Sequence, residues 1–316
     1  MRTLFGVAAD IALLVAVPQS SSAGSIVKPT TYIVSNTIGD NPENISVSAD
    51  GTMYVSSVGT GAVYRGNTAD ATLHPFIPAG ADGRHQATGV RVDPWGMIFV
   101  AGYDTGTLYV YDRNGHLLAK RETVSGAALN DLAFGNGADY VTDPAKQTIW
   151  RASLSADHVG RLTAWLTADR FSPAAGFLNG IAITPDRRTL LVADQISNVT
   201  YHVNIADRIA TALTVVHAPD GSFSADGLLL EGHRLYGIYN YSDPADPSKI
   251  DFVTRLVHLD DASTTATWVA DSAAVHEADT PTGIARDGCR LLWVNSQLFA
   301  DPNTTPYTVT QVPGLT

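Results

Sequence analysis

The sequence predicts an all-β protein with the fold of a six-bladed β-propeller. The main observation is a short phrase that recurs six times: a polar residue, an apolar run, a turn and a second apolar run. Its clearest copies are LNDLAFGNGADYV at 129–141 and LNGIAITPDRRTLLV at 178–192. A second observation is the spacing of the copies, which begin 42 to 56 residues apart. Periods of about 40–50 residues with several short strands are typical of propellers, with one four-stranded antiparallel sheet per blade.

The six copies align on their leading polar residue. These leading residues are Glu43, Thr88, Asn130, Asn179, Asp226 and Thr282. The residues that follow them are Asn44, Gly89, Asp131, Gly180, Gly227 and Gly283. The second apolar run ends 11 to 13 residues after the leading residue, at Val55, Val100, Val141, Val192, Ile238 and Val294. This nearly constant offset indicates one structural unit repeated six times.

The strands of a unit follow from the pattern inside each copy. The fourth copy predicts strands at 180–184, 189–192 and 199–203, with a turn at Pro185-Asp186 between the first two. The second copy repeats this arrangement at 90–92, 98–100 and 108–111. The first strand of each copy is short and apolar throughout, as expected for a strand that is buried on both faces.

Closure of the ring is predicted from the two ends of the chain. The last unit runs from Thr282 to a strand at 308–312 and lacks a fourth strand. The segment Thr31–Ser35 (TYIVS) precedes the first copy and is predicted to pair in the last blade, because this pairing removes an open sheet edge. Two segments rich in Asp, Pro and Ser, at 240–252 and 299–307, are predicted loops.

Composition and charge restrict the partners. The chain is 45% hydrophobic and its net charge is -11, which repels phosphate backbones and anionic membranes and argues against nucleic acid. Beyond the N-terminus no apolar run approaches the ~20 residues that span a bilayer. Residues 1–23 have the pattern of a secretory signal peptide, with Arg2, an apolar stretch and small residues before Ala23. We therefore expect a secreted or periplasmic protein with one domain over 24–316, and the sequence leaves its oligomeric state open.

Several chemically reactive residues are expected to serve structure. Asp143 and Asp194 end the second strands of their copies, in VTD and VAD. Their carboxylates are predicted to form hydrogen bonds that hold turns. The single cysteine, Cys289, has no partner for an internal disulfide and is predicted to be a small buried strand residue.

The candidate site comes from the common register of the leading residues. In a propeller the first strands surround a central channel, so residues at matching positions form a ring around one axis. Four members of this ring carry carboxylates or carboxamides: Glu43, Asn130, Asn179 and Asp226. Such groups are costly to bury without partners, and oxygen ligands with two carboxylates suit a hard divalent cation. The sequence predicts one such ion, with Ca²⁺ favoured and Mg²⁺, Mn²⁺ or Zn²⁺ as alternatives.

A simpler interpretation treats these residues as turn formers, because Asn179-Gly180 and Asp226-Gly227 are common turn dipeptides. However, the hairpin turn lies about seven residues later in the copies, for example at Asp186-Arg187 and Asp287-Gly288. The leading residue is not needed for that turn, which favours the metal site.

The repeated phrases resemble those of a known family. PENISVSADGTMYVS, LNDLAFGNGADYVTD, LNGIAITPDRRTLLVAD and SADGLLLEGHRLYG are similar to motifs of the SMP-30/gluconolactonase-like lactonases, which are six-bladed propellers with a metal in the channel. The resemblance implies that Glu43, Asn179 and Asp226 are metal ligands and that Asp226 is also the general base. It implies that Asn130 holds water or substrate beside the metal.

The chain departs from the family pattern at two positions. Asn44 follows Glu43 where the family usually has glycine, and Ala128 stands where many sugar-lactone members have an arginine that grips the substrate. The second departure implies a substrate less polar than a sugar lactone.

These observations predict a metal-dependent hydrolase that opens a lactone or related ester. The metal would stabilise the developing oxyanion, Asp226 would take the proton of the attacking water, and Asn130 would position water or substrate. No G-x-S-x-G, Walker A or H-E-x-x-H pattern is present. The alternatives are a non-enzymatic propeller that binds a ligand or partner around a structural Ca²⁺, and a strictosidine synthase-like enzyme with the same architecture.

Overall fold

A computed structural model describes residues 28–240, 251–276, 280–300 and 302–315. The predicted signal peptide and most of the predicted loop at 240–252 lie outside these residues. The described residues contain no α-helix, only the two short 3-10 turns η1 (Ala81–Gly83) and η2 (Ala168–Arg170). Among them, no helix is long and apolar enough to cross a membrane.

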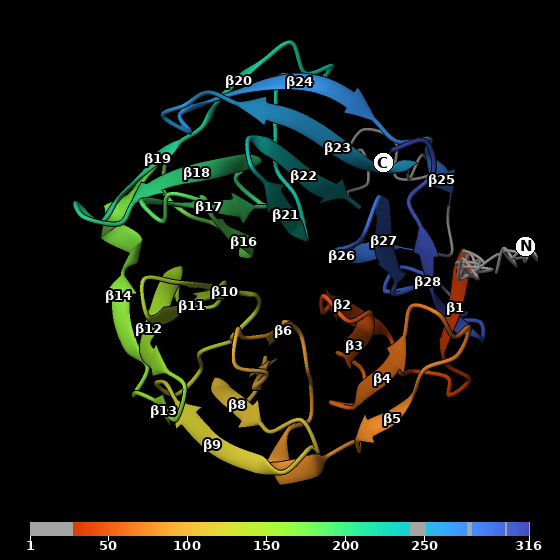
Figure 1. Cartoon of the computed structure of the whole chain (residues 1–316). Helices are drawn as coiled ribbons and strands as arrows, with labels where there is room; N and C mark the ends of the chain where they lie inside the picture. Colours follow the sequence, from red (N-terminus) through yellow and green to blue (C-terminus); the bar gives the residue numbers. More distant parts are fainter. Residues whose placement is uncertain (1–27, 241–250, 277–279, 301, 316) are drawn as a thin grey trace, which may run out of the picture.

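The strands form six separate sheets arranged around one axis, which confirms the six-bladed propeller (Figure 1). Blade 1 contains β2 (Pro42–Val47), β3 (Thr52–Ser57), β4 (Val63–Asn67) and β5 (His74–Ile77). Blade 2 contains β6 (Val90–Val92), β7 (Ile98–Gly102), β8 (Thr107–Tyr111) and β9 (Leu117–Glu122). Blade 3 contains β10 (Leu132–Gly135), β11 (Ala138–Asp143), β12 (Thr148–Ser155), β13 (His158–Val159) and β14 (Thr163–Leu166).

The remaining blades follow the same order. Blade 4 contains β15 (Phe171–Ser172), β16 (Leu178–Ile183), β17 (Thr189–Asp194), β18 (Val199–Asn204) and β19 (Ile209–Ala212). Blade 5 contains β20 (Thr214–Val216), β21 (Leu228–Glu231), β22 (Arg234–Tyr239), β23 (Asp251–Leu259), β24 (Thr265–Asp271) and β25 (Val275–His276). Blade 6 contains β26 (Pro281–Asp287), β27 (Arg290–Asn295), β28 (Tyr307–Gln311) and β1 (Thr31–Ser35).

Each blade has four antiparallel core strands, as predicted, and three blades add short strands at their edges. In blade 3, β13 pairs with β12, and in blade 5, β25 pairs with β23. The added strands β15 and β20 pair in parallel with β19 and β24, so blades 4 and 5 are not purely antiparallel.

The N-terminal strand closes the ring, as predicted. β1 pairs antiparallel with β28, with Tyr32 opposite Val309 and Ile33 opposite Thr308. The side chains of Tyr32 and Val34 are buried against blade 1 and blade 6. The first and last parts of the described chain thus share one sheet, which leaves no unpaired edge on β28.

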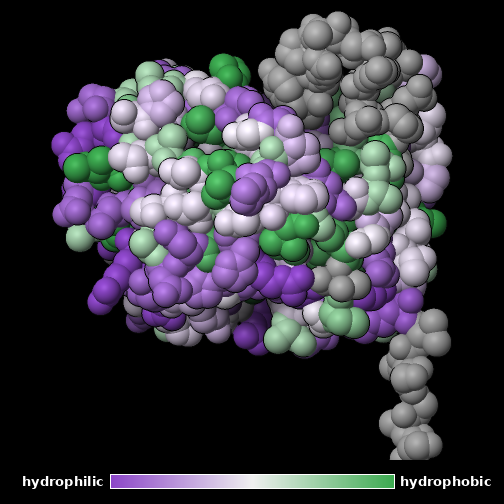
Figure 2. All heavy atoms as spheres, turned by 90° about the horizontal axis from the view of Figure 1, so that it is seen from above, coloured by the Kyte–Doolittle hydropathy of each residue, from purple (hydrophilic) through white to green (hydrophobic). Residues whose placement is uncertain are grey.

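The apolar core is divided into six clusters, one between each pair of neighbouring blades. Between blades 5 and 6, for example, Tyr236 and Ile238 pack with Leu291 and Trp293. The other five clusters are likewise formed by buried aliphatic and aromatic side chains. Because apolar side chains are used between the blades, the outer surface in side view mixes polar residues with small scattered apolar areas (Figure 2).

The strand directions place the candidate site at one mouth of the channel. Each inner strand begins near its leading residue, and the second strand returns antiparallel to the same level; Pro281, for example, lies opposite Asn295. The loops that enter inner strands and those that leave second strands therefore surround one opening, termed the ring mouth. The loop predicted at 299–307 lies here, between β27 and β28.

Two sequence predictions are wrong. The inner strands are not buried on both faces throughout, because Arg91 in β6 and Leu229 and Leu230 in β21 line a cavity in the channel and are only partly buried. Cys289 is exposed, and it lies in the hairpin turn between β26 and β27 and not within a strand. The turn places the residue at the opposite face from the ring mouth, where its side chain does not enter a cluster between blades.

Candidate metal centre

The structure brings the four predicted site residues together at the top of the inner strands. Glu43 lies in β2 and Asn179 in β16, whereas Asn130 and Asp226 precede β10 and β21. All four are buried, with between 4% and 7% of each residue exposed. Each is placed by the same local structure, the start of an inner strand, which is why a sequence repeat can form a ring.

Hydrogen bonds connect three of these residues through two that sequence reasoning missed. Asn130 Nδ2 donates to Asn179 Oδ1 at 3.0 Å, and Asn179 Nδ2 donates to Gln195 Oε1 at 2.8 Å. Gln195 Nε2 donates to Asn240 Oδ1 at 3.0 Å, and Asn240 Nδ2 donates to Asp226 Oδ2 at 2.5 Å. Gln195 and Asn240 each follow a second strand, so the return of that strand to the ring mouth was the signal that could have identified them.

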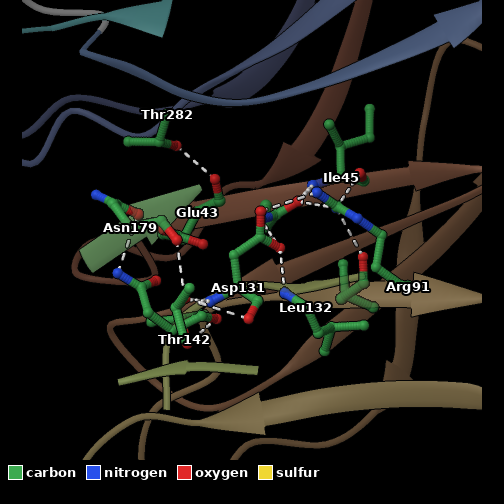
Figure 3. Close-up of polar contacts among 12 residues, drawn as sticks. Glu43, Ile45, Arg91, Asp131, Leu132, Thr142, Asn179 and Thr282 are labelled. Carbon is green, nitrogen blue, oxygen red and sulfur yellow. Dashed lines mark hydrogen bonds and ion pairs between the residues drawn. The ribbon is translucent and has the colours of Figure 1, made fainter. Parts of the chain in front are cut away.

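The two leading threonines complete the ring through the backbone. The hydroxyl of Thr282 donates to the carbonyl oxygen of Glu43 (Figure 3). The hydroxyl of Thr88 lies within hydrogen-bonding distance of the carbonyl oxygens of Leu129 and Asn130. These hydroxyls point to neighbouring backbone, so they hold the inner strands together and do not extend the set of free oxygens.

Glycine allows the inner strands to approach so closely. A Cβ atom added to Gly180 would lie 2.3 Å from the carbonyl oxygen of Asp226, well inside van der Waals contact. Instead, the Gly180 N–H donates to that oxygen at 2.9 Å. The glycines of three other copies, Gly89, Gly227 and Gly283, face the next inner strand in the same way. Glycine after the leading residue therefore sets the small radius of the ring.

Burial changes the protonation of both ring carboxylates. Desolvation raises the pKa of Glu43 well above its ordinary value, and the negative charges of Asp226 and Asp131 raise it further, while Arg91 lowers it. Desolvation raises the pKa of Asp226 to about 7, although hydrogen bonds from Asn240 and Asn179 favour its charged form. A positive charge among these residues would reverse both shifts.

Two buried ring oxygens have no hydrogen-bond partner among the described residues: Glu43 Oε2 and Asn130 Oδ1. Buried oxygens of this kind are costly unless a ligand completes their coordination. Two carboxylates and two carboxamides form a donor set of the type that Ca²⁺ accepts, so the residues present fit a hard divalent cation. Within the described parts of the chain, no three His, Cys, Asp or Glu side chains cluster as a metal site, so a cation at the ring would need carboxamide ligands as well.

The surroundings of the ring mouth include exposed apolar side chains. Ile38, Leu298 and Phe299 are 62%, 42% and 61% exposed, and all three lie on loops at this opening. The two loops are joined, because Asn41 Nδ2 donates to the carbonyl oxygen of Ser296 at 2.9 Å. These three residues are termed the apolar rim.

Asp143 and Asp194, at the ends of two second strands, make structural hydrogen bonds, one of them with the backbone of Ala128. Ala128 is buried, and its N–H donates to Asp143 Oδ1 at 3.1 Å. Asp143 also accepts from Trp150 Nε1, and Asp194 accepts from the N–H groups of Gly176, Phe177 and Ser197. The N–H groups of Lys146 and Ser197, in the turns that follow the two strands, donate to Asp143 Oδ1 and Asp194 Oδ1 at 3.0 Å, which confirms that both aspartates hold turns.

Comparisons with known proteins identify the fold and leave the family undetermined. No family model and no curated protein matches the sequence. Among solved structures, the gluconolactonase XC5397 from Xanthomonas campestris is similar over 87% of each chain, with a TM-score of 0.59 and 15% identity. Virginiamycin B lyase from Staphylococcus aureus covers 90% of this chain and 98% of its own, with a TM-score of 0.55 and 13% identity.

A chain of the mitotic checkpoint complex covers 98% of this chain and 99% of its own, with a TM-score of 0.56 and 13% identity. At such identities the likeness shows only that the propeller fold is shared. Any assignment of function depends on the side chains of the ring.

Proposed function

We propose that this protein is a metal-dependent hydrolase that opens a lactone or related ester at the ring. The observation that carries the proposal is a buried set of two carboxylates and two carboxamides in which Glu43 Oε2 and Asn130 Oδ1 have no protein partner. A site that binds a cation and handles a proton needs such oxygens and such carboxylates. A gluconolactonase has the same fold, so the propeller architecture is compatible with this assignment.

Glu43, Asn179 and Asp226 would hold the ion, with Ca²⁺ favoured. A divalent cation bound there supplies a Lewis acid for a carbonyl oxygen and balances the two carboxylates. Asn179 is already oriented for this role, because its amide group is held by both Asn130 and Gln195.

The side chains of the ring would move and position the proton of water. Asp226 accepts it as general base, and the hydrogen bond from Asn240 fixes the orientation of the Asp226 carboxylate. Asn130 has a free Oδ1 that accepts a hydrogen bond from water or a substrate hydroxyl, while its Nδ2 is fixed by Asn179. A serine nucleophile is not required.

The substrate we propose carries an apolar substituent. The apolar rim, formed by Ile38, Leu298 and Phe299, is exposed on loops at the same end of the propeller as the ring. Ala128 offers no charge for a sugar hydroxyl, and its small side chain is buried. An acyl or aryl group on the lactone would lose water contact against the rim, which contributes about 0.8 kcal/mol per buried CH₂.

The experiment that tests the proposal follows proton release from a panel of lactones and aryl esters. We expect turnover that is lost in EDTA and restored by Ca²⁺. Asp226→Asn should lower kcat by about 10²–10⁴-fold while circular dichroism shows an intact fold. Full activity of that variant, or activity unaffected by EDTA, would reject the mechanism.

Two other outcomes identify the alternatives. Binding of Ca²⁺ without turnover of any substrate would favour a ligand-binding propeller with a structural ion. The shared fold with a lyase makes elimination a second candidate reaction. Turnover in ¹⁸O-labelled water separates the two reactions, because only hydrolysis places ¹⁸O in the product.

Export directed by residues 1–23 is part of the proposal and is tested by N-terminal sequencing of protein recovered from outside the cytoplasm.

A further inference from the structure

Two of the six ring residues are not followed by glycine. Asn44 follows Glu43 and Asp131 follows Asn130, and both are buried. In three of the four copies with glycine, at Gly89, Gly180 and Gly227, the glycine N–H donates to the carbonyl oxygen of the leading residue in the next copy. A hydroxyl from the second strand replaces this bond at the two exceptions. Ser56 Oγ bonds the carbonyl oxygen of Thr88, and Thr142 Oγ1 donates to that of Asn179 at 2.8 Å.

The side chains of the two exceptions meet at one arginine, which lies beside Asp131 in Figure 3. Arg91, in β6, forms an ion pair with Asp131, with 3.0 Å between Nη2 and Oδ2. Its Nη1 donates to Asn44 Oδ1 and, at 3.1 Å, to the carbonyl oxygen of Ile45. Asn44 Nδ2 closes the triangle by donating to Asp131 Oδ1 at 3.2 Å. Asn44, Arg91 and Asp131 are termed the Arg91 brace, and they join blades 1, 2 and 3 directly behind the ring.

The brace supports the two ring residues that have free oxygens. Glu43 and Asn130 contain the unpartnered atoms Oε2 and Oδ1, and each is the chain neighbour of a brace residue. The side chains of Asn130, Asn179 and Asp226 also make hydrogen bonds of their own within the ring mouth. The brace also pairs the negative charge of Asp131, so the carboxylates that face the axis are those of Glu43 and Asp226.

We infer that the Arg91 brace is a positioning device that holds Glu43 and Asn130 in the geometry needed to bind the cation and a water. This inference rests on the proposed metal centre and assigns to Asn44 and Arg91 a role that the resemblance leaves unexplained. Residues that orient ligands from behind fix the metal geometry, and their loss weakens metal affinity without removing a ligand.

The structure offers a matched control on the other side of the channel. Below the ring, a cavity of about 360 Å³ is lined by the inner strands, and both Arg91 and Arg286 reach it. Arg286 pairs with Glu231 of the neighbouring blade, with 2.9 Å between Nε and Oε1. Its side chain is 18% exposed, against 19% for Arg91. Arg286 does not belong to the brace, and its carboxylate partner does not adjoin a ring residue.

The test measures Ca²⁺ affinity by calorimetry for the wild type, Arg91→Met, Arg91→Lys, Asn44→Gly and Arg286→Met, with melting temperatures in EDTA. We expect Arg91→Met to weaken Ca²⁺ binding by about 10–100-fold, the range for residues that orient metal ligands. Arg91→Lys should fall between it and wild type, because lysine keeps the charge and loses the fork. Arg286→Met should bind within about twofold of wild type, since only a loss above roughly tenfold marks an orienting residue.

Asn44→Gly keeps the test decisive if Arg91→Met does not fold, because glycine occupies this position in four other copies. A variant that folds and binds Ca²⁺ at least tenfold more weakly supports the brace. A lower melting temperature in EDTA with unchanged affinity, for either brace variant, would show a purely structural role and overturn the inference. If the wild type binds no divalent cation, the proposed metal centre itself fails, which is a distinguishable result.

Discussion

Two buried carboxylates, Asp194 and Glu43, differ in their hydrogen-bond partners. Asp194 is fully buried and accepts hydrogen bonds from the N–H groups of Gly176, Phe177 and Ser197, so its charge is compensated within the protein. Glu43 is also buried, with 7% of the residue exposed, but it retains an oxygen without a partner among the described residues. The first arrangement stabilises loops, whereas the second is suited to a cation.

This distinction predicts a specific effect of Asp194→Ala. The substitution leaves three partly buried N–H groups without their acceptor, so the free energy of unfolding should fall by about 2–4 kcal/mol in denaturant titrations. Affinity for Ca²⁺ should change little, because Asp194 does not belong to the ring. The conservative Asp194→Asn should lose less stability, and a large loss of Ca²⁺ affinity in either variant would place Asp194 in the metal centre.

At the residue scale, the sequence predicted the ring and missed its supports. Glu43, Asn130, Asn179 and Asp226 share one register of a repeat, and register alone brings them to the axis. Gln195 reaches the ring from a second strand, so it shares no register with the leading residues. The Arg91 brace depends on contacts between three blades, and no local pattern contains that information.

The inner strand is the element that converts the repeat into a site, and its glycines control the spacing. A methyl group at Gly180 meets the backbone of Asp226 and Leu228, which cannot move without moving the ring. Gly221, in a loop, has nothing within 4 Å of an added Cβ and needs glycine only for its φ of +70°.

Gly180→Ala is therefore expected to lower the free energy of unfolding by about 1–3 kcal/mol or more through overpacking. It should also weaken Ca²⁺ binding, because Asp226 is displaced. Gly221→Ala should cost only about 1–2 kcal/mol for the left-handed backbone and leave affinity unchanged. Thermal melts and calorimetry on both variants measure the two effects, and equal Ca²⁺ affinity in both would refute the link between strand spacing and the ring.

The closing strand gives a second prediction for an element. Removal of residues 25–36 deletes β1, exposes the edge of β28 and removes Tyr32, whose hydroxyl donates to the carbonyl oxygen of Thr68 at 2.9 Å. We expect a decrease of more than about 10 °C in melting temperature, since at least two buried side chains and one strand of backbone pairing are lost. A chain that lacks only residues 1–24 serves as the control. An unchanged melting temperature after removal of residues 25–36 would contradict the role of β1.

At this scale the sequence predicted the core strands well, because their apolar runs and turns are local features. The predicted 90–92 strand and the Thr31–Ser35 strand coincide with β6 and β1. The two-residue strands β13 and β15 were not predicted. β15 depends on pairing with residues 210–211, far along the chain. β13 forms a tight hairpin with the end of β12, and a strand of two residues has no periodic pattern that could reveal it. Cys289 was placed wrongly because a repeat pattern specifies where a hairpin lies more reliably than which residues form its turn.

For the whole molecule, the raised pKa values of the ring carboxylates couple stability to pH and metal. Without metal, the folded protein retains a proton on Asp226 up to about pH 7, whereas an unfolded aspartate loses it near pH 3.9. Between these values the native state binds more protons, so stability must fall as the pH rises. The raised pKa of Glu43 acts in the same direction.

We therefore expect the melting temperature in EDTA to fall by at least about 5 °C between pH 5 and pH 8, from a destabilisation of a few kcal/mol. Asp226→Asn should flatten this dependence. Ca²⁺ should raise the melting temperature more at pH 8 than at pH 5, because protons compete with the metal for the carboxylates. A metal-free protein that becomes more stable across this pH range would contradict the electrostatics of the ring.

The central claim is that six equivalent strands place Glu43, Asn179 and Asp226 around one cation. Long-wavelength anomalous diffraction from crystals grown with Ca²⁺ tests it most directly. We expect one strong anomalous peak on the propeller axis, at about 2.3–2.6 Å from oxygens of all three side chains. Ordered ring side chains with no peak between them at saturating Ca²⁺, or a peak bound elsewhere, would contradict it.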